Sequence, residues 1–131
     1  MNPTATPIGS RYSERETDIG SLTYTDGMLR IEIDTLSSEG LEVCLEIEFT
    51  GPRGFRLLDE GDLLPYWEAG VFAGGYHLFE ITAGGWRAQE TQLGMLPVSD
   101  ALDSNEYFVA TTNTCLNVLA ASPPRIDERP R

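Results

Sequence analysis

Residues 41–49 read LEVCLEIEF, and a large apolar side chain occupies every second position. Successive side chains point to opposite faces of an extended strand, so Leu41, Val43, Leu45, Ile47 and Phe49 share one face. Glutamates dominate the other face. This period of two predicts a half-buried β-strand with an acidic outer side, around which the neighbouring segments pair.

The preceding segment, SLTYTDGMLRIEID at residues 21–34, predicts a β-hairpin around Asp26-Gly27. A two-residue turn of this type places Thr25 opposite Met28 and Leu22 opposite Ile31, which keeps the apolar side chains on one face. The second arm then pairs antiparallel with 41–49. In that register the outward residues of both strands lie side by side: Arg30, Glu32, Asp34, Glu42, Glu46 and Glu48.

The rest of the chain alternates short apolar runs with turn signals. Residues 55–58 predict a strand, 62–69 a short helix, 76–82 and 86–91 a hairpin across Gly84-Gly85, and 106–112 with 115–121 the closing strands. Residues 92–106 form the longest irregular connection, a type of loop that often carries function. The expected fold is all-β, a mostly antiparallel sandwich or partly open barrel of about seven or eight strands with one short helix.

Composition predicts one domain with two tails. Residues 1–19 are rich in Pro, Thr, Ser and charge, and residues 123–131 in Pro and Arg, so both predict flexible segments flanking a single domain at 20–122. No apolar run resembles a signal peptide or a membrane span, which predicts a cytoplasmic protein.

The charge balance is strongly acidic, with 21 acidic residues against 9 basic ones and a net charge of −12. Such a field repels nucleic-acid phosphates and anionic membranes and attracts basic proteins. It also keeps a protein soluble whatever its function. Nucleic acid and membranes are therefore excluded as expected partners, and a basic protein partner is favoured.

Catalytic and metal motifs are weak. The single histidine, His77, has no nucleophile signature beside it, and Cys44 and Cys115 match neither a metal-ligand nor a redox spacing. Carboxylates at 59, 60, 62 and 68 beside Tyr66 and Trp67 suggest a sugar site, and those at 59, 60 and 62, or at 100, 103 and 106, suggest a calcium site. So acidic a chain produces such clusters by chance. We expect no cofactor and no metal.

Three functions fit these observations. The leading hypothesis is a non-catalytic protein-binding module, such as a bacterial immunity protein or antitoxin that neutralises a basic partner through Glu32, Asp34, Glu42, Glu46, Glu48, Trp67 and Trp86. The alternative is a small-molecule-binding barrel or sandwich with an aromatic pocket formed by Tyr66, Trp67, Phe72, Tyr76 and His77. The third is a hydrolase that uses His77.

Overall fold

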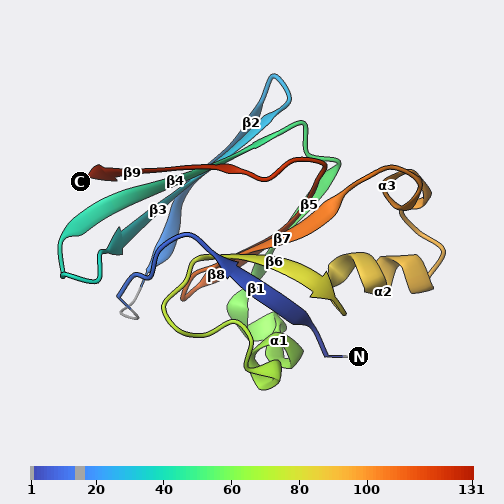
Figure 1. Cartoon of the computed structure of the whole chain (residues 1–131), viewed down its shortest axis with the longest axis horizontal. Coiled ribbons are helices and arrows are strands. Elements are labelled where there is room, and N and C mark those ends of the chain that lie inside the picture. The colour runs from blue at the N-terminus through green and yellow to red at the C-terminus, as the bar shows by residue number, and fades with distance from the viewer. Residues whose placement is uncertain (1, 14–16) are drawn as a thin grey trace.

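Nine strands form two antiparallel sheets in the part of the chain that the computed structural model describes, residues 2–13 and 17–131 (Figure 1). The all-β prediction is confirmed, as a sandwich rather than a closed barrel. The five-stranded sheet has the order β1 (Thr4–Ile8), β6 (Leu78–Ala83), β7 (Asn105–Ala110), β8 (Thr114–Ala120), β5 (Gly54–Asp59). The four-stranded sheet has the order β2 (Asp18–Thr25), β3 (Met28–Leu36), β4 (Glu42–Thr50), β9 (Arg125–Pro130).

The hairpin around Asp26-Gly27 is confirmed in its register. Thr25 pairs with Met28 and Leu22 with Ile31, while β3 pairs antiparallel with β4 as expected. Asp26 and Gly27 both have positive φ angles, 54° and 75°. This is the backbone that a two-residue turn of matching twist requires, and Asp-Gly adopts it readily.

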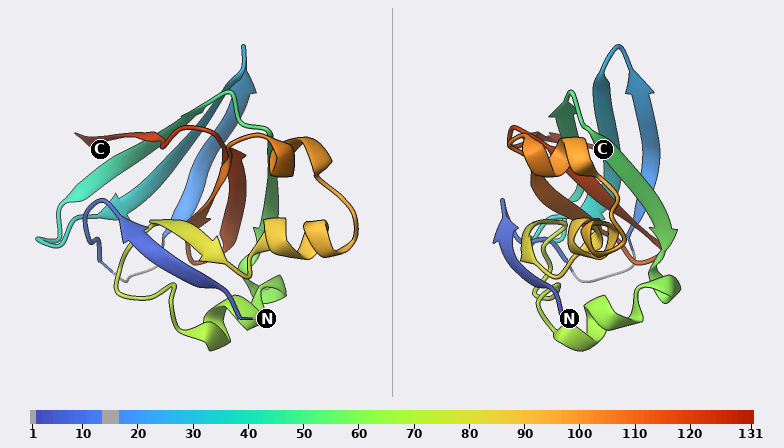
Figure 2. Two further views of the ribbon diagram at one scale, coloured as in Figure 1. Left: turned by 45° about the vertical axis from the view of Figure 1, so that its right-hand side comes forward. Right: turned by 90° about the vertical axis from the view of Figure 1, so that its right-hand side faces the viewer.

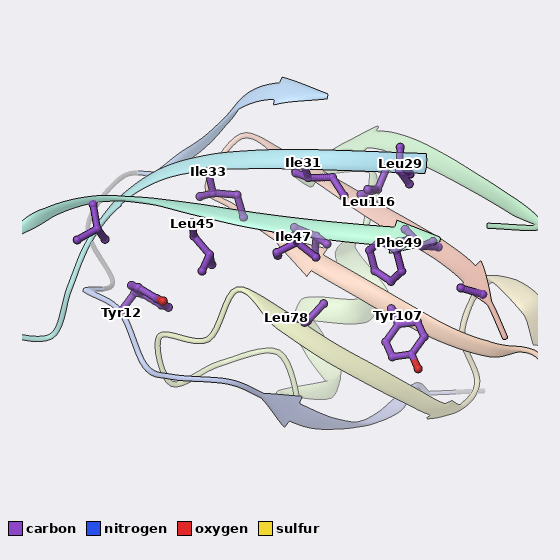
Figure 3. Packing of buried hydrophobic residues seen from close by; sticks show 14 residues of the cluster. Tyr12, Leu29, Ile31, Ile33, Leu45, Ile47, Phe49, Leu78, Tyr107 and Leu116 are labelled. Atoms are coloured by element: carbon purple, nitrogen blue, oxygen red, sulfur yellow. The ribbon is translucent and has the colours of Figure 1, made fainter. Parts of the chain in front are cut away.

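The main core lies between the two sheets. Apolar side chains of β3 and β4, such as Ile31, Ile47 and Phe49, are fully buried and point towards Tyr107 and Leu116 of the five-stranded sheet (Figure 3). The ring centroids of Phe49 and Tyr107 lie 5.4 Å apart. The period of two in residues 41–49 therefore positions one sheet of the sandwich.

A second core covers the other face of the five-stranded sheet. The predicted short helix is present as a 3-10 turn, η1 (Glu60–Asp62), followed by α1 (Leu64–Ala69), which ends at Gly70 with φ 74°. Tyr66 of α1 and the nearby Phe72 pack on Phe79 and Phe108 of the sheet. The five-stranded sheet is thus buried on both faces, and the molecule has three layers.

Both chain ends extend the sheets beyond the predicted domain limits of 20 and 122. β1 pairs with β6 and β9 pairs with β4, each at the edge of its sheet, where the sequence predicted a lead-in and a tail. Ile8 and Ile126 contact the main core. An edge strand needs only one or two apolar side chains and a partner with free backbone groups, so neither segment shows the alternation that predicts a strand.

The hairpin predicted across Gly84-Gly85 is wrong. Its second arm is a helix, α2 (Trp86–Gln92), and a further helix, α3 (Pro97–Ala101), follows in the predicted long connection. The sequence WRAQETQ lacks a period of two and contains good helix formers, which favours the helix. Across residues 2–13 and 17–131 no helix reaches the length and hydropathy needed to cross a membrane.

Candidate functional site

The predicted acidic face exists, but it contains arginines from an unexpected source. On the outer side of β3, β4 and β9, strand pairing places Glu32 opposite Glu46 and Arg30 opposite Glu48. β9 adds Arg125 beside Glu48 and Arg129 beside Cys44, with Arg131 just beyond the strand. The face as a whole carries six carboxylates and four guanidinium groups: Glu32, Asp34, Glu42, Glu46, Glu48 and Asp127, with Arg30, Arg125, Arg129 and Arg131.

The central glutamates of this face are ion-paired within the protein. Glu48 accepts from Arg30 Nη2 at 2.6 Å, and Glu46 accepts from Arg129 Nη1 at 3.1 Å. The side chains of Glu46 and Glu48 are only 14% and 9% exposed. These carboxylates raise the pKa of Arg30 and Arg129 through the same hydrogen bonds. Glu46 and Glu48 are therefore neutralised by neighbours, whereas Asp34 and Glu42 at the margin stay exposed.

The two predicted aromatic anchors lie on the other side of the molecule. Trp67 belongs to α1, where its Nε1 donates to the Glu60 carbonyl at 2.7 Å. Trp86 begins α2, and the Arg56 guanidinium lies 5.5 Å from its ring centroid. α1 covers the outer face of the five-stranded sheet, and α2 lies beyond the end of β6 (Figure 2). The structure therefore does not bring these tryptophans together with the strand glutamates.

A second group of carboxylates surrounds η1 and α1. We call Asp59, Glu60, Asp62 and Glu68 the α1 acidic group. None of the four forms an ion pair with a described residue, and Asp59 accepts a hydrogen bond from the Gly61 amide at 2.8 Å. Among the described residues no cluster of His, Cys, Asp or Glu has the arrangement of a metal site.

His77 is part of the core. The Ala110 carbonyl can only accept, so Nδ1 donates to it at 2.8 Å, and Nε2 accepts from the buried Thr35 hydroxyl at 2.9 Å. The ring lies 5.3 Å from that of Tyr12. Burial lowers the pKa of His77 and keeps it neutral. With both nitrogens occupied and Thr35 inaccessible, the ring has no free atom for hydrolysis.

This burial predicts an acid-sensitive fold. The unfolded histidine titrates near pKa 6.5, above the lowered pKa of folded His77, so the unfolded state gains a proton first as pH falls. The contribution of His77 to the free energy of unfolding should be constant above about pH 6.5 and should decline as pH falls below it. Denaturant titrations between about pH 5 and pH 7 test this. His77→Gln should flatten the decline, and an unchanged slope in that variant would contradict this assignment.

The predicted aromatic pocket is small and open. Trp67, Phe72, Tyr76 and His77 line a depression of about 150 Å³, together with residues 13, 17, 75 and 110–112. Tyr66 lies beneath it, stacked on Phe72 at 5.1 Å. Small-molecule sites usually measure about 300 Å³ or more. Four of the five predicted residues do line one depression, but Trp67, Phe72 and Tyr76 also pack in the second core.

A buried polar network that the sequence analysis missed lies under α2. Glu106 of β7 accepts from the backbone amides of Trp86 at 2.9 Å and Arg87 at 3.1 Å, and from Asn117 Nδ2 at 2.9 Å. Burial raises the pKa of Glu106, and these donors oppose the increase. A Cβ on Gly85 would lie 2.7 Å from the carboxylate, so glycine is needed there. The network holds the start of α2 on the sheet, beside an open groove of about 500 Å³.

The two cysteines do not form a disulfide. Cys44 lies on the outer face of the four-stranded sheet, and Cys115 lies under α1 on the far side of the five-stranded sheet. Burial raises the pKa of both thiols, that of Cys115 to about 11. Both are therefore protonated and unreactive at neutral pH.

The fold and its surface define a class, a three-layer antiparallel sandwich with one helix-covered sheet and an acidic exterior. Comparison with known proteins does not narrow this class to a family. No protein-family model, no curated protein and no solved structure matches the chain.

Proposed function

We propose that this protein is a non-catalytic binding module for a basic protein partner, of the kind that neutralises a toxin as an immunity protein or antitoxin in the bacterial cytoplasm. The supporting observation is where the negative charge lies. The outer face of β3, β4 and β9 carries −2, so −10 of the total −12 lies elsewhere in the chain. Carboxylates without an arginine attract a cationic surface at long range and fix its register on contact.

The α1 acidic group carries part of this negative charge without an arginine from the described residues paired to it, unlike the centre of the strand face. Its four carboxylates lie within ten residues, and Glu68 and Asp62 are exposed. In contrast, Glu46 of the strand face already contacts three arginines, and Glu48 contacts two. We therefore expect a basic partner to depend on the α1 acidic group more than on the strand face.

Two charge-matched variants test the proposal. One is Glu60→Gln with Asp62→Asn and Glu68→Gln, and the other is Glu42→Gln with Glu46→Gln and Glu48→Gln. The immobilised chain should retain a basic protein from an extract of its source cells, and the dissociation constant of the purified pair should rise with salt. The α1 variant should weaken that pair about tenfold at low salt, because each lost charge contributes a modest amount.

The strand variant serves as the control. It should reduce stability more than affinity, because it leaves Arg30, Arg125 and Arg129 facing one another. A retained partner that is acidic or neutral, or an affinity that salt and both variants leave unchanged, would overturn the proposal.

A further inference from the structure

The segment from α2 to α3 reverses the usual distribution of polar and apolar side chains. We call residues 86–103 the α2–α3 arch. α2 has no buried residue, and the one buried residue of α3 is Ser99. The inward side chains are polar instead: Arg87 pairs with Asp100 at 3.2 Å and donates to the carbonyls of Ser99 at 3.3 Å and Ser104.

This polar interior holds the arch in one shape. Thr91 Oγ1 donates to Asp100 Oδ2 at 2.9 Å, and the Met95 amide donates to the Glu90 carbonyl at 2.9 Å. The arch is tied to the turn before β5 as well, because Arg53 Nη2 donates to the Asp103 carbonyl at 3.2 Å. A surface that is ordered before binding loses less conformational entropy on binding.

The outward side of the arch is apolar. Leu93, Met95, Val98 and Leu102 are 76%, 54%, 63% and 50% exposed. They are four of the eight large hydrophobic side chains that are exposed in the described part of the chain, and they lie within ten residues of one another. Neither core includes them. Exposed apolar groups concentrated in one rigid segment mark an interaction surface.

The arch lies at one side of the molecule (Figure 1). The surrounding charge decides which occupant fits. Glu90 and Asp103 form no ion pair with a described residue, and Arg87, the arch's one cation, is held inward by Asp100. A second copy of the chain would bring another net charge of −12, and an anionic membrane is repelled in the same way.

We propose that the α2–α3 arch docks an amphipathic segment of a basic protein, an inference that rests on the proposed function. Apolar side chains of that segment cover Leu93, Val98 and Leu102, and its lysines or arginines face Glu90 and Asp103. Apolar contact at the centre with complementary charge at the rim is the usual arrangement of a protein interface.

The test titrates the full-length, isotope-labelled chain with a short amphipathic peptide of leucine and lysine and follows its backbone amide resonances. Shifts should concentrate at residues 93–102. Leu93→Ser with Val98→Ser should weaken binding at least tenfold. The matched control Tyr24→Ser with Leu41→Ser removes two other exposed hydrophobic side chains, so it should leave binding unchanged. A peptide of leucine and glutamate should not bind.

The remaining outcomes separate the two proposals. Equal weakening by both serine variants, or shifts confined to other residues, overturns the arch as the docking site. If only the Glu60, Asp62 and Glu68 substitutions weaken binding, the arch fails and the proposed function stands. If the peptide does not bind, or binds without regard to salt, the arch inference fails, and the proposed function is then decided by the partner retained from the cell extract. Binding to phosphatidylserine vesicles, or dimerisation that the arch variant abolishes, identifies a different occupant and overturns the inference.

Discussion

Removal of residues 123–131 is expected to lower the free energy of unfolding by about 5 kcal/mol, which is comparable with the whole stability of a small domain. β9 occupies the edge of β4, Ile126 contacts the main core, and Glu128 accepts from the Tyr12 hydroxyl at 2.7 Å. Several ladder hydrogen bonds at about 1 kcal/mol each and the partly buried side chain of Ile126 account for the size of the loss. Denaturant titration of the shortened chain measures it.

Two point variants sharpen this prediction. Ile126→Asp keeps the strand but removes its apolar contact, and should cause an intermediate loss. Asp127→Asn alters an exposed side chain of the same strand and should change stability little. A shortened chain with the midpoint of the full chain would show that these residues behave as the tail predicted from composition.

Glu106→Ala is expected to lower the free energy of unfolding by about 4 kcal/mol, because it removes the acceptor of three hydrogen bonds at a site that is itself buried, and Asn117 keeps only its bond to the Tyr66 hydroxyl. The donors of these three bonds are the amides of Trp86 and Arg87 and the side chain of Asn117. Thermal or denaturant unfolding measures the loss, and amide hydrogen exchange should localise it to α2.

Glu106→Gln separates the effect of losing the hydrogen-bond acceptor from the effect of losing side-chain volume. Glutamine fills the same space but offers one carbonyl oxygen where the carboxylate uses both, so it should recover only part of the loss. Glu68→Ala, at an exposed site on α1, should stay within about 0.5 kcal/mol of the parent. A Glu106→Gln variant as stable as the parent would contradict the role given to the carboxylate.

The parts of the fold that were predictable are those in which one segment carries its own signal. Residues 41–49 show the alternation of a strand, and Asp26-Gly27 shows the turn that sets its neighbour's register. β1, β9 and α2 carry no such signal. β1 and β9 become strands because β6 and β4 have free edges. α2 becomes a helix whose first backbone amides donate hydrogen bonds to the Glu106 carboxylate.

The same limit applies to the candidate site. Alternation correctly placed Glu32, Glu46 and Glu48 on one face. Their neutralisation was not predictable, because Arg129 is 83 positions from Glu46 in the sequence and reaches it through a strand that composition identifies as a tail. The inverted polarity of the α2–α3 arch was also hidden, since Leu93, Val98 and Leu102 look like core residues until the three layers are known.

The arginines of the four-stranded sheet also act as cross-links. Arg125 reaches both Glu46 and Glu48, and Arg129 reaches both Glu32 and Glu46, so each guanidinium joins two carboxylates. A lysine ammonium has the same charge but is a compact point without the planar fork of arginine. Exchange of these arginines for lysine would therefore conserve the formal charge but weaken the network of ion pairs that holds these carboxylates together on one surface.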